Sequence, residues 1–114
     1  MSKKKLKIAQ DYTTTPGPRY IKEGSWSGEK LRNEIVFPQV SESIKKNEKI
    51  EIDLDGTAGY GTSFLEEVFG GLIRENKLDY DELVEFIEIK SDEEPYLIED
   101  IFEYLKDAYE NPDE

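Results

Sequence analysis

Hydrophobic and polar residues alternate in three short stretches, at residues 5–9, 50–54 and 86–89. Successive side chains on a β-strand point to opposite faces, so this alternation predicts three strands that each bury one face. In the middle stretch the buried face would carry isoleucine and leucine, and the outer face glutamate and aspartate. Residues 19–22 follow a loop rich in proline and glycine, and they predict a further short strand that pairs with the first as a hairpin.

Apolar residues recur at helical spacing in three longer stretches, which predict helices near 27–46, 62–74 and 97–109. The first contains Pro38, which lacks a backbone N–H and clashes with the carbonyl one turn earlier. We therefore expect this helix to kink or restart there. Residues 79–84 predict an additional short helical turn.

These elements predict a single α/β domain with the order β-β-α-β-α-β-α. Because the strands alternate instead of being apolar throughout, we expect a mixed sheet with helices mainly on one face and water on much of the other. The chain of 114 residues has the length of one domain. We place the domain at residues 1–110 and expect residues 111–114 to be a disordered acidic tail.

Composition excludes several kinds of chemistry. The chain has no histidine and no cysteine, so it lacks the commonest general base, the commonest transition-metal ligand and any thiol chemistry. Its net charge of −12 is concentrated in residues 79–114, which carry −13, whereas residues 1–78 carry +1. Such a surface repels nucleic acid, and no apolar run is long enough to span a membrane. A cytoplasmic protein that binds neither nucleic acid nor membrane is the expectation.

The most informative stretch is residues 49–74, where a strand, a glycine-rich turn and a helix follow one another. Gly56, Gly59 and Gly61 lie in the turn, where glycine tolerates backbone angles that other residues resist. Thr62 or Ser63 is expected to cap the helix that follows. Two adjacent glycines at 70 and 71 indicate close packing against a neighbour or a frayed last turn.

A phosphate-binding loop is one interpretation of this stretch. Gly56 and Gly61 have the spacing of G-x-x-x-x-G-K-[ST], and Ser63 falls on its last position. Thr62, however, replaces the lysine that contacts the terminal phosphates. Nucleotide hydrolysis is therefore not expected, although sensing of a small ligand or nucleotide by the Gly56–Gly61 loop remains the alternative function.

Two carboxylates, Asp53 and Asp55, lie at the end of the central strand, where α/β proteins often place their sites. Being two residues apart, they share one face. They could hold a metal ion or accept a phosphoryl group. The simpler interpretation is that they are solvated, or that Asp55 binds the backbone of the following turn.

The run IDLDGTAGYGTSFLEEVFGGL resembles the core of STAS domains, a family named for sulphate transporters and anti-sigma-factor antagonists. Asp53-Leu54-Asp55 resembles the D-L-S end of the STAS strand, and Gly61-Thr62-Ser63-Phe64 aligns with the D-S-S-G start of the next helix. Residues 28–38 and 50–73 are more specifically similar to the uncharacterised STAS-like branch. Gly61 replaces the motif's aspartate and Phe64 its final glycine.

The resemblance implies a non-enzymatic regulatory module that binds a protein partner and needs no cofactor or metal. In anti-sigma-factor antagonists the second serine of the motif is phosphorylated, and that role would fall on Ser63, with Thr62 beside it. The implied partner is an ATP-binding kinase of the anti-sigma type. We expect contact through the helix at 62–74 and the loop before it; the candidate residues are Tyr60, Thr62, Ser63, Glu66 and Glu67.

Overall fold

The sheet at the centre of the fold has three parallel strands. The computed structural model describes residues 3–111, with strands β1 (Lys4–Lys7), β2 (Ile50–Asp53) and β3 (Ile87–Lys90) in the order β1-β2-β3. Leu6 lies beside Ile52 and Ile52 beside Ile89, so one row of apolar side chains crosses the sheet. All three strands predicted from alternation are present.

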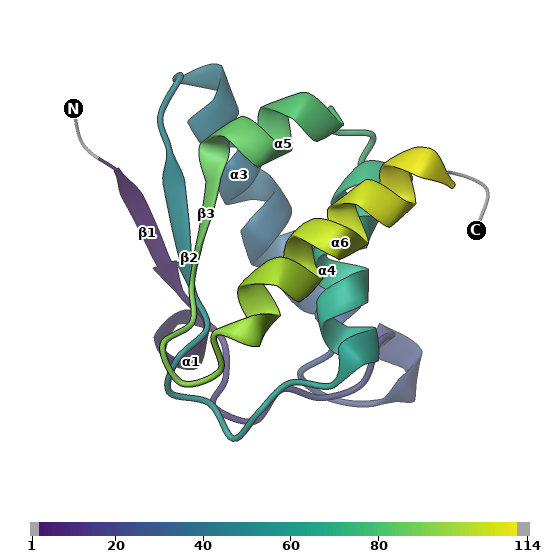
Figure 1. Cartoon of the computed structure of the whole chain (residues 1–114). Coiled ribbons are helices and arrows are strands. Elements are labelled where there is room, and N and C mark those ends of the chain that lie inside the picture. Colours follow the sequence, from purple (N-terminus) through teal and green to yellow (C-terminus); the bar gives the residue numbers. More distant parts are fainter. Residues whose placement is uncertain (1–2, 112–114) are drawn as a thin grey trace.

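The helices lie mainly on one side of this sheet (Figure 1). Strands added in one direction by right-handed crossovers place their connections on the same face. Between β1 and β2 the chain forms α1 (Ile8–Asp11), η1 (Ile21–Glu23), α2 (Gly28–Leu31), η2 (Arg32–Val36) and α3 (Phe37–Lys45). Helices α4 (Thr62–Arg74) and α5 (Tyr80–Phe86) precede β3, and α6 (Tyr96–Glu110) follows it.

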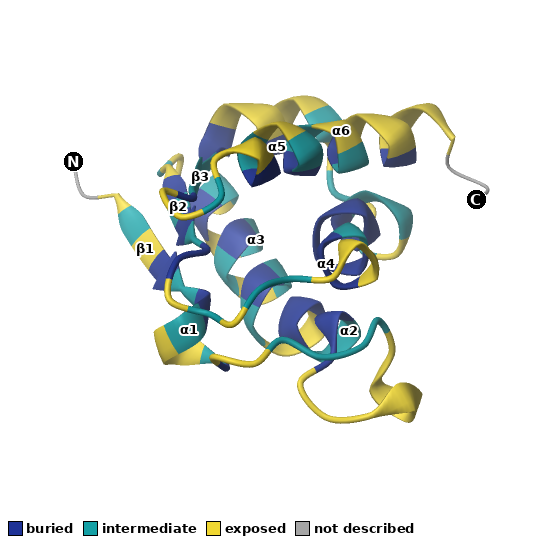
Figure 2. Cartoon of the chain, turned by 60° about the horizontal axis from the view of Figure 1, so that its bottom comes forward, coloured by how far each residue is buried: buried dark blue, intermediate teal, exposed yellow. Residues whose placement is uncertain are grey.

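The hydrophobic core lies between the sheet and these helices, as the dark blue segments of Figure 2 show. Ile50 and Ile52 are completely buried, and so are Val68 and Phe69 of α4. The other face of the sheet carries charges that pair across strands. Lys7 lies 3.3 Å from Asp53, and Lys3 lies 2.7 Å from Glu88.

The segment from α2 to α3 is one helical path interrupted by a π-turn. Ser27 caps its start, where its hydroxyl accepts a hydrogen bond of 3.1 Å from the Lys30 N–H. The π-turn η2 ends immediately before Phe37 and Pro38. Because Pro38 has no N–H to donate, the wider turn lets the helix pass the proline. The expected distortion is therefore present, and the helix continues to Lys45.

Two details differ from the prediction. Residues 19–22 form a loop and the start of η1 instead of a strand, since the Pro18 and Arg19 carbonyls accept hydrogen bonds from Gly28 and Glu29. Without that strand, the sheet is parallel and not mixed. Asn111 is the C-terminal cap of α6, and the rest of the predicted tail, 112–114, lies outside the described residues. Among residues 3–111, no helix has the length and apolar character needed to cross a bilayer.

Candidate functional site

The start of α4 presents two hydroxyl side chains to solvent. Gly61 is the N-cap residue, so neither Thr62 nor Ser63 caps the helix, contrary to expectation. Both are exposed in the first turn. Within residues 3–111, no side chain caps this helix end, and its first N–H groups remain available to an anion.

Three backbone N–H groups of the glycine-rich loop before α4 donate to acceptors within the domain. The N–H of Gly56 donates to the Glu93 carboxylate at 3.0 Å, and the N–H of Ala58 donates to the Thr14 carbonyl at 2.8 Å. The N–H of Gly59 donates to the Thr57 hydroxyl. Gly56 and Gly59 have φ angles of 94° and 131°, which explains why glycine occupies these positions.

Tyr60 belongs to the core more than to the surface. Its ring packs against Phe64, with ring centroids 5.8 Å apart, and its hydroxyl donates to the Leu54 carbonyl at 2.8 Å. Burial raises the pKa of Tyr60 to about 12. This residue therefore fixes the loop against α4 and offers a partner only part of its ring.

Asp55 joins the loop after β2 to the turn after β3. Its buried carboxylate accepts hydrogen bonds from the N–H groups of Glu93 and Asp92, at 2.9 and 3.1 Å, and from the Lys90 ammonium at 3.0 Å. These donors, led by the Glu93 N–H, lower the pKa of Asp55 to about 2. Asp53 lies on the same side and accepts from the Asp55 N–H and from Lys7. Asp55 thus holds the ends of β2 and β3 together, and Asp53 joins the ends of β2 and β1.

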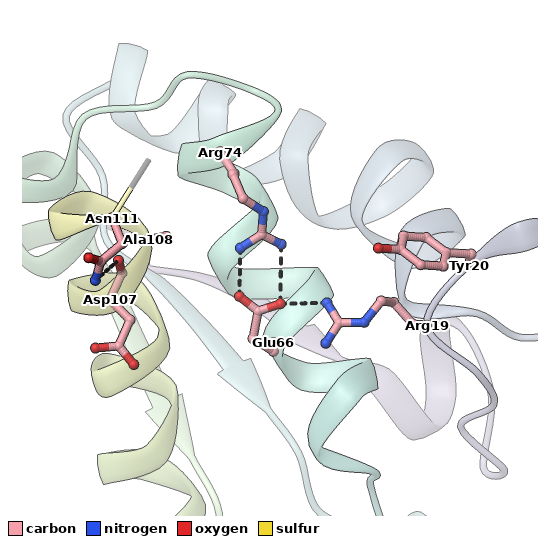
Figure 3. Close-up of a pocket in the computed structure, with 7 residues that line it drawn as sticks. All are labelled: Arg19, Tyr20, Glu66, Arg74, Asp107, Ala108 and Asn111. Atoms are coloured by element: carbon pink, nitrogen blue, oxygen red, sulfur yellow. Dashed lines mark hydrogen bonds and ion pairs between the residues drawn. The ribbon is translucent and has the colours of Figure 1, made fainter. Parts of the chain in front are cut away.

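Glu66 and Glu67 are part of an arginine–glutamate cluster and not free surface residues. Glu66 lies between Arg19 and Arg74, at 2.5 and 2.6 Å, as Figure 3 shows. Glu67 is 4% exposed; it pairs with the buried Arg32 and also with Arg19, at 3.2 Å. The expectation that these glutamates face a partner is therefore wrong for Glu67, and Glu66 is already held by two guanidinium groups.

The two glycines of α4 make room for this cluster. A side chain at position 71 would meet the guanidinium of Arg32, and one at position 70 would meet the Glu66 carboxylate. Near the start of α4, a Cβ at Gly28 would lie 2.6 Å from the Phe64 carbonyl oxygen. Close packing, the first of the two explanations suggested by the sequence, accounts for the glycine pair.

A family model for the STAS-like domain of unknown function (DUF4325) matches residues 27–97. This match covers more than half of the chain and includes α2, the central strand, the loop and α4. The chain belongs to this STAS-like family. A search of curated proteins and a search of solved structures each returned no match.

In this STAS-like domain, an open cleft of about 510 Å³ lies beside the arginine–glutamate cluster. Side chains of Arg19, Glu66 and Arg74 face the cleft together with Asp107 at the end of α6 (Figure 3). These four side chains comprise two positive and two negative groups, so their charges balance. Within residues 3–111, no cluster of acidic side chains is arranged to hold a metal ion.

Sequence reasoning did not find the arginines that hold Glu66 and Glu67. Arg19 is 47 residues from Glu66, and Arg32 is 35 residues from Glu67. The one available signal was the Gly70–Gly71 pair, because such a pair on an otherwise apolar helix indicates that a bulky group lies against it. Nothing in the pattern indicated that the bulky group was a guanidinium.

Proposed function

We propose that this STAS-like domain is a non-enzymatic regulatory module that binds a protein partner and is switched by phosphorylation at Ser63, with Thr62 as the neighbouring acceptor. One observation carries the proposal. Two exposed hydroxyl side chains lie in the first turn of α4, a helix whose N-terminus has no side-chain cap. The resemblance to anti-sigma-factor antagonists supports it, because the serine that aligns with Ser63 is the one phosphorylated in those proteins.

The physical basis of the switch is electrostatic. A phosphate on Ser63 adds a charge of about −1.5 to −2 and three acceptor oxygens. The free N–H groups and the positive end of the helix dipole stabilise this charge on its own domain. The same charge penalises a partner surface that was complementary to the neutral hydroxyl, so phosphorylation releases the partner.

The partner proposed from the family resemblance is an ATP-binding kinase of the anti-sigma type. It would dock on the exposed part of the α4 start, where Thr62 and Ser63 are accessible and the edge of Tyr60 contributes. Glu66 and Glu67 act indirectly in this proposal, because the arginine–glutamate cluster keeps α4 rigid below the docking surface.

Nucleotide sensing by the Gly56–Gly61 loop is less well supported. A loop that cradles phosphate needs several free N–H groups that converge on the ligand. Here the N–H groups of Gly56, Ala58 and Gly59 already donate to acceptors within the domain. Binding a phosphate there would require breaking these hydrogen bonds.

The decisive experiment isolates the protein from its native host, identifies what co-purifies and maps modified residues by mass spectrometry. Wild type, Ser63→Ala, Ser63→Asp and Ser41→Asp are compared. Ser41 is a half-buried hydroxyl on α3, so its substitution adds the same charge away from the helix end. We expect a kinase to co-purify with all of these except Ser63→Asp, and part of the wild type to carry phosphate at Ser63.

Equal partner recovery by Ser63→Asp and Ser63→Ala, together with an unmodified Ser63, would contradict the switch. Recovery of no specific protein would contradict the docking function itself. A large thermal shift on adding ATP or a divalent ion to the purified domain would favour ligand sensing instead.

A further inference from the structure

An exposed aromatic loop precedes α2. Three large apolar side chains are exposed within seven residues: Tyr20 is 38% exposed, Ile21 51% and Trp26 43%. Figure 2 shows this segment as a mostly yellow loop that extends from the body of the domain near α2. We call residues 20–26 the aromatic loop. Clustered exposed apolar groups of this kind mark interaction sites more often than isolated ones do.

The aromatic loop is held in a defined shape. Trp26 has a φ of 60°, in the left-handed region that bulky residues rarely adopt, and Gly24 has a φ of 151°. The Trp26 carbonyl accepts a hydrogen bond of 2.9 Å from the Gly17 N–H, and the ring of Tyr12 meets the Trp26 ring edge-on with centroids 5.3 Å apart. Strained backbone angles are common at functional sites, and here the strained residue carries an indole exposed on the surface. The strain therefore supports a binding role for Trp26.

The acidic side chains around the aromatic loop are already hydrogen-bonded, whereas the basic ones are not paired with a carboxylate of the described residues. Glu23 accepts a hydrogen bond from the Tyr20 N–H at 3.0 Å, and Glu29 accepts one from the Ile21 N–H at 2.9 Å. Both carboxylates are therefore engaged with the loop's own backbone. The ammonium groups of Lys22 and Lys30 have no carboxylate partner among residues 3–111.

A hollow of about 380 Å³ lies between Ile21 and Trp26, and its lining contains one charged side chain, Lys30. A second hollow of about 440 Å³ is lined by Ile21 together with Tyr20, Lys22 and Glu29. The first hollow thus offers an apolar wall beside an unpaired cation. That combination is complementary to an apolar side chain flanked by a carboxylate.

We propose that the aromatic loop is a docking surface for an acidic segment of a protein partner. An apolar side chain of that segment enters the hollow between Ile21 and Trp26, and an adjacent carboxylate pairs with Lys30. The inference rests on the proposed function as a partner-binding module and names the chemistry of the partner. Shaped hollows favour a protein segment over a lipid surface, and the acidic character of the segment follows from the local charge, because the negative excess of the chain lies in residues 79–114 and not around the loop.

The loop lies close enough to α4 to belong to one docking surface with it. Arg19, immediately before the loop, pairs with Glu66, and Gly28, just after it, lies against the backbone of Phe64. A partner that covers Ser63 could therefore extend onto Trp26 without spanning the domain.

A peptide-display selection on the full chain tests the proposal. We expect the enriched peptides to combine a large apolar residue with neighbouring aspartate or glutamate. Trp26 is the only tryptophan, so a shift of its emission to shorter wavelength reports directly on covering of the loop. Peptides without an acidic bias, or peptides that leave Trp26 emission unchanged, would overturn the proposal.

Variants of the loop, compared with a matched control variant, distinguish a loss of binding from a general loss of folding. Trp26→Ser and Ile21→Ser should each weaken binding of the selected peptides by at least about tenfold, as expected for a central anchor. Lys30→Glu should weaken the binding of acidic peptides and reverse its salt dependence, because salt then screens a repulsion. Tyr96→Ser is the matched control, because Tyr96 is a 61% exposed aromatic residue on α6, and it should leave binding unchanged.

A membrane surface or a second copy of the chain, as occupant of the aromatic loop, would give results distinct from these. Binding to phosphatidylserine vesicles that is lost in Trp26→Ser, with no peptide enriched, would overturn the proposal in favour of a membrane surface. Sedimentation that shows self-association lost in the same variant would overturn it in favour of a second copy.

The test also separates this inference from the proposed function. If the native partner is lost in Ser63→Asp but retained in Trp26→Ser, the switch survives and the loop proposal fails. If the partner is lost in Trp26→Ser and retained in Ser63→Asp, the loop proposal survives without the switch.

Discussion

The guanidinium of Arg32 lies against Gly71 of α4 and pairs with Glu67 one turn earlier on the same helix. Arg32 is 3% exposed and Glu67 4% exposed, so the pair is withdrawn from solvent. Arg32 also donates to the Glu67 carbonyl at 3.0 Å and to Asn33 at 3.3 Å, and Glu67 also pairs with Arg19 at 3.2 Å and with Arg74 at 3.6 Å. A buried pair of this kind fixes how α2 and η2 pack on α4, and therefore how the first turn of α4 is presented.

Substitution of Gly71 by alanine should destabilise the domain. On a free helix this change stabilises by up to about 1 kcal/mol. Here the new methyl group meets the Arg32 guanidinium, and overpacking costs about 1–3 kcal/mol. We expect a net loss of unfolding free energy in urea denaturation. In an Arg32→Ala background the space is free, so the same substitution should become neutral or stabilising; an equal loss in both backgrounds would contradict the packing argument.

Removal of one member of the buried pair should be severe. Glu67→Gln or Arg32→Met leaves a buried charge without its main partner, which typically costs about 3–5 kcal/mol. The double variant should lose less than the sum of the two single losses, because neither charge is then stranded. Glu88→Gln is the control, since its exposed pair with Lys3 is worth only about 0–1 kcal/mol. Additive losses would show that the pair is not coupled.

Asp55 should make stability depend on pH at acidic values. Its folded-state pKa of about 2 lies below the ordinary value of 3.8, so the ionised form is favoured in the native state. The stabilisation is fully present above about pH 5 and is lost as pH falls towards 2. Asp55→Asn should cost about 1–3 kcal/mol at neutral pH and flatten the stability curve in this range, as measured by thermal unfolding. An unchanged slope would contradict the assignment.

A negative charge at Ser63 should stabilise the helix end. Ser63→Asp is expected to raise the unfolding free energy by about 0.3–1 kcal/mol at low salt, because the carboxylate interacts with the free N–H groups and the helix dipole. Ser63→Asn is the control, because asparagine has nearly the same shape as aspartate without its charge. Ser63→Lys should instead lower the unfolding free energy. The differences should shrink as salt is added. Equal stabilities for Asp and Lys would show that this helix end does not favour anions.

The sequence by itself determined which side chains face the core. Strand and helix periods differ, so the alternation at Ile50 and Ile52 and the helical spacing of Val68 and Phe69 each specify one buried face. These residues are completely buried in the structure. The same logic located the strand, loop and helix that carry the candidate site, and the residues that resemble a STAS core.

Only the tertiary structure decided what the polar residues do. The outward pattern of Glu66 and Glu67 is the same whether they meet water or arginine, and their partners Arg19 and Arg32 are at least 35 residues away. Residues 19–22, predicted as a strand, are likewise not paired in the sheet, and their apolar residues Tyr20 and Ile21 are exposed to solvent. Local periodicity indicates which face of a helix or strand is apolar. Charge pairing depends instead on which distant segment of the chain folds beside that element.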